Sequence, residues 1–500
     1  MNRGKRMACK TRIELNRATI GRLPPSVNAP AYDPAAIEPG IVHLGLGGFH
    51  RAHMARYTHD TMEADASAFG WGIVGAGLMP GDRGMIEALA PQDGLYTLVE
   101  RDGSGESAAV IGSIPRVVFA ADSSAELLEV MDGEGIRIVS LTVTENGYCL
   151  DASTKRLDPE HRLISADLQN PTQPKSAIGV IVEGYARRRA AGRPAFTALT
   201  CDNIQHNGTV LKNAVLDFAR LRDADLAAWI EENARFPSTM VDRITPVTRA
   251  ADVSAFEERY GLADQRPVFC EPFRQWVIED DFPLGRPAWE TVGAQFVPDV
   301  SPYEFMKLRL LNGSHLAVAG VGRLCGYTYI DESLADPRIA GFMAALMDRE
   351  TGPTLPAIEG IDLAEYKAKL LERFANPSIK DTVERVNTDA PINVLVDPIR
   401  DRLRDDQPVE LLSLALAAWL RRVRGEDEQG QPIDVRHPLA KELKEKAIQG
   451  GDDPRPLLGI RRLFGELGDD PRLVEPVGRW LKLLYEKGAS AALDEVSGKA

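Results

Sequence analysis

The sequence predicts an α/β N-terminal Rossmann-like doubly wound domain followed by a mostly α-helical C-terminal domain. The chain has 500 residues, which exceeds the size of one ordinary domain. Its first half alternates short apolar runs with helical stretches, whereas its second half consists of long segments with helical spacing. We therefore expect an N-terminal extension over residues 1–35, a Rossmann-like domain over 36–295 and a helical domain over 296–490.

Buried strands are expected at several apolar runs of the first half. Each run is short and bounded by glycine or charged residues, which is typical of a strand covered on both faces. The runs are Ile41–Leu46, Trp71–Leu78, Ile136–Thr144 and Ala195–Cys201. Helical stretches such as Ser176–Ala191 separate them. Strands that alternate with helices predict a parallel sheet with helices on both faces.

The pattern of apolar residues changes from about residue 301 onward. The long segments of the second half have few β-branched runs and carry apolar residues at helical intervals. They are Glu304–Gly326, Asp362–Ala375, Pro408–Gly425 and Val474–Lys487. Pro287–Pro302 is expected to join the two regions, and residues 489–500 are expected to form a frayed tail.

Charge and cysteine content exclude several classes of protein. The net charge of −14 gives no electrostatic reason to bind nucleic acid or an anionic membrane. Five widely spaced cysteines without a CxxC pair argue against a disulfide framework and suit a reducing cytoplasm. The apolar run Leu411–Leu420 is about ten residues, half of what a membrane span needs, and predicts a buried helix. The basic N-terminus lacks the apolar core of a signal peptide.

A glycine-rich turn follows the first expected strand. Glycines let a backbone approach a pyrophosphate closely, and a following helix N-terminus offers free N–H groups. The expected contacts to a dinucleotide are Gly45, Gly47, Gly48, Phe49, His50 and Arg51. The last position of the GxGxxG pattern is His50 instead of glycine, so a purely structural turn is the alternative. His50 and His53 are three residues apart, but no third ligand with metal spacing accompanies them, and we expect no metal.

Asp82 follows the second expected strand. An acidic side chain there can accept hydrogen bonds from the adenosine ribose and repel a 2′-phosphate, which favours NAD over NADP. Its neighbour Arg83 could instead receive that phosphate. A carboxylate in a turn rich in Gly and Pro is the structural alternative.

The segment Glu304–His315 holds the most informative polar residues. On a helix of 3.6 residues per turn, Glu304, Lys307 and His315 share one face with Leu311, and Asn312 lies at its edge. A surface helix would place such polar residues opposite its apolar ones. Burial would lower the pKa of a lysine and allow it to act as a general base. A structural ion pair between lysine and glutamate is the alternative reading.

Several motifs together resemble the polyol-specific long-chain dehydrogenases, a family that includes mannitol 2-dehydrogenase and fructuronate reductase. The motifs are GLGGFHRAH (45–53), TVTENGYC (142–149), CDN and HNG (201–208), FPSTMVDRITP (236–246), CEPF and QWV (270–277), and MKLRLLNGSH (306–315). The resemblance covers residues from about 30 to 490. It implies NAD as cofactor and a small polyol or sugar acid as substrate.

The resemblance assigns roles residue by residue. Lys307 matches the catalytic lysine, Asn203 and Asn312 match the asparagines that hold the reacting oxygen, and His315 matches a substrate-binding histidine. Val241 and Asp242 match the loop beside substrate and nicotinamide. Glu304 and Glu145 match carboxylates near the lysine, Asp82 matches the ribose-binding aspartate, and Arg385 matches an arginine that reaches the substrate.

The chemistry of these side chains agrees with such roles. A neutral Lys307 could accept the hydroxyl proton while the hydride leaves the alcohol carbon. Amide donors from Asn203 and Asn312 could stabilise the charge that develops on oxygen, each by about 3–4 kcal/mol if they act as oxyanion-hole donors do. The ammonium polarises the carbonyl in the reverse direction, so this chemistry requires no metal.

The substrate is left open between two pairs. Arg385, His206 and the second glycine of Gly47–Gly48 resemble the mannitol dehydrogenases, which favours D-mannitol and D-fructose. Arg274 and Arg400 resemble the fructuronate reductases, and an arginine is well shaped to bind a carboxylate such as that of D-mannonate. We expect the neutral polyol, with the sugar acid as the alternative.

Two other classes of protein remain as alternatives. A non-catalytic nucleotide-binding protein would keep the glycine turn but could dispense with Lys307 and the asparagines. A structural protein with a helical second half would not respond to NADH at all. For the enzyme, the resemblance implies a monomer or homodimer, and the cysteine content suits the cytoplasm.

Overall fold

The computed structural model describes residues 12–151, 154–385 and 391–498. The chain divides into two compact units, Met1–Val300 and Ser301–Ala500. This division falls five residues beyond the boundary that the sequence predicts at 295/296. Each unit is described by itself below.

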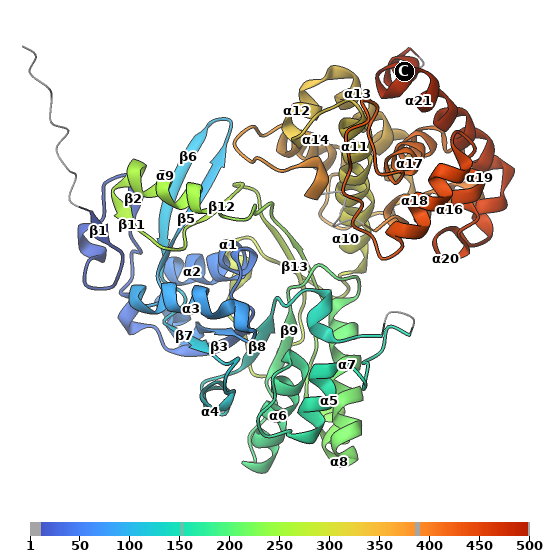
Figure 1. Ribbon diagram of the computed structural model, residues 1–500. Coiled ribbons are helices and arrows are strands. Elements are labelled where there is room, and N and C mark those ends of the chain that lie inside the picture. The colour runs from blue at the N-terminus through green and yellow to red at the C-terminus, as the bar shows by residue number, and fades with distance from the viewer. Residues whose placement is uncertain (1–11, 152–153, 386–390, 499–500) are drawn as a thin grey trace, which may run out of the picture. The chain divides into compact units, whose positions relative to one another are not determined.

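The first unit is built on a five-stranded sheet (Figure 1). In spatial order its strands are β7 (Arg116–Phe119), β4 (Gly72–Gly77), β3 (Pro39–Leu44), β8 (Ile138–Leu141) and β9 (Thr197–Thr200). All four neighbouring pairs are parallel. The strand order 3-2-1-4-5 is that of a doubly wound Rossmann sheet, and it reverses between β3 and β8. Four of these strands coincide with the predicted ones; β7 was not predicted.

Alternate residues of the central strands enter different cores. Ile41, Ile73 and Ile138 face one core, whereas Val42 and Val74 face the other, as the period of two in a strand requires. The first face is covered by α2 (Met54–Ala64) and α3 (Arg83–Leu89), the second by α4 (Ala125–Met131), α6 (Ala177–Ala190), α7 (Asn207–Arg222) and α8 (Ala224–Asn233) (Figure 1). Both sheet faces are therefore apolar, which explains the continuous apolar runs in the sequence.

Smaller sheets complete the first unit. A four-stranded sheet joins β12 (Val268–Cys270), β5 (Tyr96–Asp102), β6 (Gly105–Ile111) and β2 (Val27–Asn28). A three-stranded sheet joins β10 (Thr239–Asp242), β13 (Gln275–Glu279) and β14 (Gln295–Val297). The sequence did not predict these sheets. The boundary between the two units lies within the predicted joint Pro287–Pro302, after Val300, but β14 inside that stretch belongs to the first unit.

The predicted N-terminal extension is integrated into the first unit over its described part. β1 (Ile13–Glu14) pairs with β11 (Leu262–Ala263), and β2 pairs with β6. Leu15 and Val27 are buried in a core that these strands share with α9 (Ala250–Tyr260). Long-range pairing of this kind leaves no local pattern, so residues 12–35 read as an appendage. Residues 1–11 lie outside the described part.

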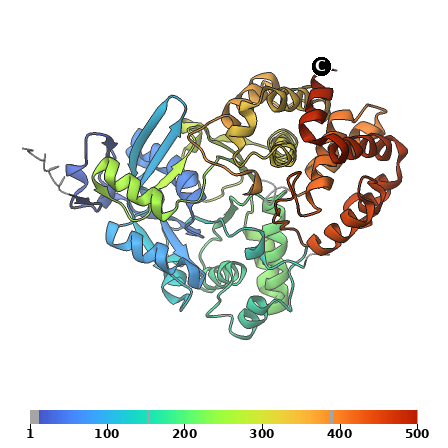
Figure 2. The same ribbon diagram turned by 45° about the horizontal axis from the view of Figure 1, so that its top comes forward.

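Helices form the regular structure of the second unit, coloured yellow to red in Figures 1 and 2. Within the described residues they are α10 (Ser301–Met306), η8 (Lys307–Asn312), α11 (Gly313–Leu324), α12 (Ile330–Ala335), α13 (Pro337–Leu346), η9 (Met347–Thr351), η10 (Gly352–Thr354), α14 (Leu363–Phe374), α16 (Asn393–Arg404), α17 (Glu410–Arg422), α18 (Ala440–Gly450), α19 (Arg455–Leu458), α20 (Arg461–Phe464), η11 (Gly465–Asp469) and α21 (Pro471–Ser497). Helix α17 contacts both α11 and α21. All residues of Leu411–Leu420 are buried, as predicted.

The prediction of a frayed C-terminal tail was wrong. Helix α21 continues to Ser497 across a kink at Gly488, where φ is 82°. Ala489, Ala492, Leu493 and Val496 are buried, and the Ala489 N–H donates to the Glu428 carboxylate at 2.6 Å. A stripe of mostly small residues buries little area per residue, which is why its pattern was hard to distinguish from a tail.

Among residues 12–151, 154–385 and 391–498, no helix is long and apolar enough to cross a membrane. The four cysteines within the described ranges, Cys149, Cys201, Cys270 and Cys325, are free thiols. Cys9 lies outside those ranges.

Candidate functional site

The glycine turn lies where the strand order of the sheet reverses. Gly45 follows β3 with φ of 94°, and a Cβ there would lie 2.1 Å from the Thr142 carbonyl oxygen at the end of β8. Gly47 is exposed, and a Cβ on it would meet nothing within 4 Å. It precedes the short helix α1 (Gly48–Ala52). Gly45 thus closes the turn, while Gly47 leaves open space beside free N–H groups, the shape that a pyrophosphate requires.

His43 and His50 support this turn from below. Both are buried, and their rings stack with centroids 3.4 Å apart. His43 Nδ1 lies 2.8 Å from Ser140 Oγ, and its Nε2 lies 2.9 Å from Thr142 Oγ1, whose hydroxyl donates to the Gly45 carbonyl. Burial lowers the pKa of His43 to about 3 and that of His50 well below its usual value. Two neutral imidazoles therefore form the floor of the turn.

Phe49 and Arg51 belong to helix α1, which follows the glycine turn. The Arg51 guanidinium is buried and donates to the Arg266 carbonyl, and burial lowers its pKa to about 10. Phe49 is half-buried and stacks on His53. Of the six residues predicted to contact a dinucleotide, His50 and Arg51 have buried side chains and can act through the shape of the loop.

Asp82 follows β4 at the same edge of the sheet. It ends the short helix η4 (Pro80–Asp82), and its carboxylate accepts a hydrogen bond from the Met79 N–H at 2.8 Å. The adjacent Arg83 forms an ion pair with Asp122 at 2.7 Å and lies over the Phe119 ring. The arginine that could have bound the 2′-phosphate of NADP is therefore already paired with the Asp122 carboxylate.

Three further predicted residues lie in segments that follow strands of the first unit. Asn203 follows β9 and is exposed, next to the buried Asp202. Glu145 begins the short helix η6 (Glu145–Tyr148) after β8, is exposed, and lies 3.5 Å from Lys155. His206, exposed with φ of 53°, precedes α7. The loops after β3, β4, β8 and β9 thus carry the predicted residues at the carboxyl edge of one sheet, where α/β proteins bind ligands.

Val241 and Asp242 end β10 and are both buried. They pair with Trp276 and Gln275 of the antiparallel strand β13. The Gln275 carbonyl lies 2.8 Å from Nε2 of the buried His53. His53 is therefore bound to backbone, and among the described residues there is no group of three side chains that could hold a metal ion.

The second unit places its predicted residues on a single segment, but not on a regular α-helix. Residues Lys307–Asn312 form a π-helix, η8, between α10 and α11. The Gly313 N–H donates to the Leu308 carbonyl, five residues earlier. The prediction of uniform α-helical spacing was therefore wrong here. In a π-helix the residue at i+5 follows residue i along the axis, which moves Asn312 from the edge of the face into line with Lys307.

This stripe of polar residues is buried. Lys307 is 7% exposed, and Glu304, Asn312 and His315 are buried as well. The Asn312 Oδ1 atom has no hydrogen-bond partner among the described residues, and the His315 ring packs on Phe374 with centroids 4.3 Å apart. A buried amide oxygen without a partner costs about 1–3 kcal/mol, so it marks a group that a ligand can complete. π-Helical turns are also frequent at functional sites.

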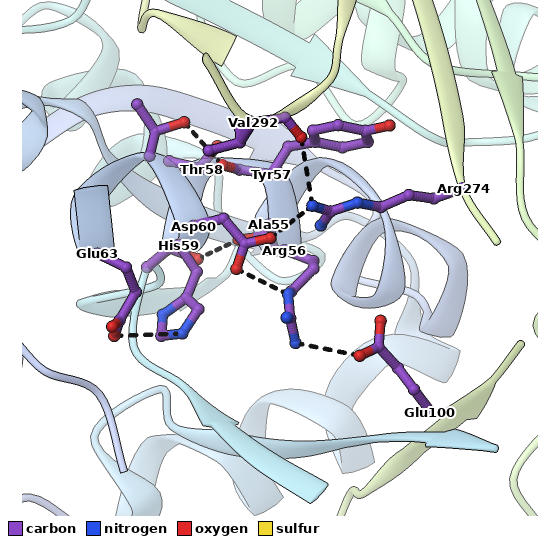
Figure 3. Close-up of polar contacts among 12 residues, drawn as sticks. Ala55, Arg56, Tyr57, Thr58, His59, Asp60, Glu63, Glu100, Arg274 and Val292 are labelled. Atoms are coloured by element: carbon purple, nitrogen blue, oxygen red, sulfur yellow. Dashed lines mark hydrogen bonds and ion pairs between the residues drawn. The ribbon is translucent and has the colours of Figure 1, made fainter. Parts of the chain in front are cut away.

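Arg274 is bound inside the first unit (Figure 3). Its guanidinium forms an ion pair with Asp60 at 2.6 Å and lies 4.3 Å from the centre of the Tyr57 ring. Asp60 also pairs with Arg56, which reaches Glu100 at 3.6 Å. Arg243 also forms an ion pair with Glu100, so the network sets three arginines against two carboxylates, and Arg274 already has a carboxylate partner in Asp60.

Arg385 and Arg400 lie in the second unit and are also paired. The Arg385 guanidinium binds Asp381, and the Arg400 guanidinium lies 2.6 Å from Asp397 on the exposed side of α16. Residues 386–390, which follow Arg385, lie outside the described part.

The structure thus brings the predicted residues together in two sets. The glycine turn, Asp82, Glu145, Asn203 and Asp242 belong to the first unit, and Glu304, Lys307, Asn312 and His315 belong to the second. Sequence reasoning missed Asp202, which organises the loop after β8. An aspartate directly after a buried strand was the available signal.

Comparisons with known proteins agree with this architecture. A family model described as the mannitol dehydrogenase Rossmann domain matches residues 39–291, and one described as the mannitol dehydrogenase C-terminal domain matches residues 299–485. The D-mannonate oxidoreductase of Escherichia coli (strain K12) is 44% identical over 471 residues, which cover 93% of this chain and 96% of that protein. A mannitol 2-dehydrogenase of Aspergillus fumigatus is 42% identical, covering 90% and 92% of the two chains.

Solved structures give the same result for the fold. The Pseudomonas fluorescens mannitol 2-dehydrogenase, in a ternary complex with NAD and D-mannitol, superposes with a TM-score of 0.87 and 40% identity. The match covers 98% of this chain and all of that one. A substrate-free D-sorbitol dehydrogenase gives a TM-score of 0.88 at 36% identity, covering 96% of this chain and all of its own. With both domain models matched in sequence, the chain belongs to the mannitol dehydrogenase family.

Proposed function

We propose that the chain is an NAD-dependent polyol 2-dehydrogenase that interconverts a polyol and its 2-ketose, with D-mannitol and D-fructose as the preferred pair. The observation that carries the proposal is the buried Lys307 on a π-helical turn in line with Asn312. A lysine in such surroundings is suited to exchange a proton with an alcohol. The relatives named as mannitol 2-dehydrogenases support the same activity.

The glycine turn is suited to hold NAD. The open space beside Gly47 admits a pyrophosphate, and the Asp82 carboxylate is available to the adenosine ribose. NAD, when bound, accepts the hydride that leaves the alcohol carbon. The Arg83–Asp122 ion pair supports NAD over NADP, because the cation at this position is already neutralised. NADP should therefore give a much lower kcat/KM than NAD, and Asp82→Ala should narrow that difference.

Lys307 takes the hydroxyl proton in the oxidative direction and returns it in reduction. Asn203 and Asn312 donate their amide N–H groups to the reacting oxygen, where negative charge develops, and His315 orients the neighbouring hydroxyl groups. Glu304, buried on the same segment as Lys307, is assigned as a carboxylate through which the proton can pass, and Glu145 is assigned the same role. Val241 and Asp242 line the approach of substrate and nicotinamide.

The ion pairs of the arginines bear on the choice of substrate. A substrate carboxylate needs an arginine with free donors, but Arg400 is paired with Asp397. Arg274 is paired with Asp60, which favours the neutral polyol, although its buried Nη1 atom has no hydrogen-bond partner among the described residues and leaves one donor for a sugar acid. Arg385, paired with Asp381, is assigned to the hydroxyl groups of the polyol. D-Mannonate and D-fructuronate are the second candidate pair, favoured by the 44% identity to a D-mannonate oxidoreductase.

The test is a spectrophotometric assay of NADH with both substrate pairs. Turnover of D-mannitol and D-fructose that exceeds turnover of the sugar acids supports the proposal. Turnover confined to D-mannonate and D-fructuronate overturns the substrate, and Arg274→Leu should then abolish it. Binding of NADH without turnover of either pair would establish the non-catalytic alternative.

We also propose a monomer or homodimer in the cytoplasm. The four cysteines within the described ranges are free thiols, which suits a reducing compartment. Light scattering coupled to size-exclusion chromatography measures the oligomeric state, and cell fractionation measures the compartment.

A further inference from the structure

The carboxylate of Asp202 organises the loop that follows β8. Asp202 is 7% exposed and lies directly before Asn203. Its Oδ1 atom accepts from the Thr144 N–H at 2.8 Å, and its Oδ2 atom accepts from the Val143 N–H at 3.1 Å and from the Tyr148 hydroxyl at 2.9 Å. The segment that follows β8 therefore supplies three donors to a single carboxylate, which lies just after the end of β9.

The backbone that this carboxylate holds is strained. Thr144 has φ of 61° and ψ of 169°, a region that glycine enters readily and a β-branched residue avoids. Strain of this kind persists only where surrounding contacts over-determine the conformation. The two consecutive N–H groups bound by Asp202 are such contacts. Burial raises the pKa of Asp202, whereas the hydrogen bonds from Val143, Thr144 and Tyr148 oppose this rise.

The same residue is anchored on its other side. The Asn207 amide donates to the Asp202 carbonyl at 3.0 Å and to the Thr239 carbonyl of β10 at 2.8 Å. The Thr239 N–H donates back to Asn207 Oδ1 at 2.9 Å. The backbone of Asp202 is thus held by Asn207 next to β10, and its side chain is held by the loop after β8. These bonds fix the position of the peptide that leads into Asn203.

We propose that Asp202 is a positioning residue that maintains the strained Thr144 turn and, through its own fixed backbone, directs Asn203 toward the reacting oxygen. The role of Asn203 rests on the proposed function. Asp202 itself contacts no substrate in this scheme. A buried carboxylate that served stability alone would give a different pattern of variants, as follows.

Asp202→Asn keeps the size of the side chain but leaves one acceptor oxygen, because the amide nitrogen would face a backbone N–H. We expect kcat to fall about 10²-fold, as misplacement of a reacting group does, while the Kd for NADH stays as in the unmodified enzyme. Asp406→Asn, a similar change at an exposed carboxylate, should alter neither value. An unchanged kcat in Asp202→Asn overturns the proposal.

Thr144→Gly tests the mechanism of the effect. Glycine adopts the observed φ without strain, so the turn no longer depends on the carboxylate. Adding Thr144→Gly to Asp202→Asn should therefore restore a large part of the lost kcat, whereas a merely structural role of Asp202 predicts no rescue. If the Asp202→Asn protein does not fold, Tyr148→Phe, which removes one donor, should lower kcat a few-fold; no change in that variant would then overturn the proposal.

A readout without turnover separates this inference from the proposed function. Hydrogen exchange of the segment 142–150, measured by mass spectrometry on the protein without substrate, should be faster in Asp202→Asn. Unchanged exchange overturns the inference whatever the enzyme does. Absence of turnover in the unmodified protein overturns the proposed function, while faster exchange in the variant would still support the role of Asp202 in the turn.

Discussion

The imidazole of His43 in β3 stacks on the imidazole of His50 in α1, with ring centroids 3.4 Å apart. The pair links the strand to the helix on either side of the glycine turn. Both rings are buried and neutral, so protonation of either histidine would place a charge in an apolar environment and destabilise the turn.

The first prediction concerns pH and stability. Burial lowers the pKa of His43, His53 and His59 to about 3 in each case. A folded-state pKa below the unfolded value of about 6.5 means that this stability is present above pH 6.5 and is lost as the pH falls toward 3. Each histidine contributes about 1.4 kcal/mol per pH unit below pH 6.5, and His50, whose pKa burial also lowers, adds a fourth such contribution. The free energy of unfolding should therefore drop by about 5–6 kcal/mol between pH 7.5 and 5.5.

Urea denaturation at the two pH values measures this change. His59→Gln should remove about a quarter of the pH dependence, because one of four similar buried histidines is lost. An unfolding free energy that is the same at both pH values would contradict the prediction.

The second prediction concerns the lysine. Lys307→Ala should lower kcat by about 10²–10⁴, the usual contribution of a general acid or base. Quenching of tryptophan fluorescence should show that NADH still binds. Lys441→Ala, at a side chain that is 92% exposed, is the control and should leave both values unchanged. Loss of NADH binding together with turnover would instead indicate a structural role for Lys307.

The third prediction compares two glycines of one turn. Gly45→Ala forces a Cβ to within 2.1 Å of the Thr142 carbonyl at a positive φ, so the protein should lose stability by several kcal/mol and show a lower Tm. Gly47→Ala meets no protein atom within 4 Å, so its Tm should stay within a few degrees of the unmodified value. Its Cβ enters the space proposed for the pyrophosphate, and the Kd for NADH should rise at least tenfold.

Differential scanning calorimetry and an NADH titration separate the two effects. If Gly47→Ala and the unmodified protein bind NADH with equal affinity, the pyrophosphate does not lie beside Gly47 and the prediction is wrong.

The fourth prediction concerns the end of the chain. Leu493 is fully buried in the last turns of α21, so Leu493→Ala should lower the free energy of unfolding by about 2–5 kcal/mol. Ile448→Ala, at a residue that is 56% exposed, should change it by less than about 0.5 kcal/mol. Equal effects of the two changes would show that the last helix packs weakly.

The sequence by itself determined the doubly wound sheet and the helical second unit. Buried strands such as Ile41–Leu46 and the helix over Leu411–Leu420 follow from local apolar patterns, because a residue's neighbours in sequence set its period. The glycine turn, Lys307, Asn203 and Asn312 could be named for the same reason, together with the resemblance of their motifs to one family.

Tertiary structure decided the features that depend on distant partners. The Asp202 carboxylate meets Val143 and Thr144 nearly sixty residues away, and β1 meets β11 across most of the first unit. The π-helical turn at Lys307–Asn312 changes which side chains line up without changing the apolar period that a sequence displays. Hydrogen bonds between remote segments and local changes of helical pitch leave no trace in a window of neighbouring residues, so they emerge when the chain is packed.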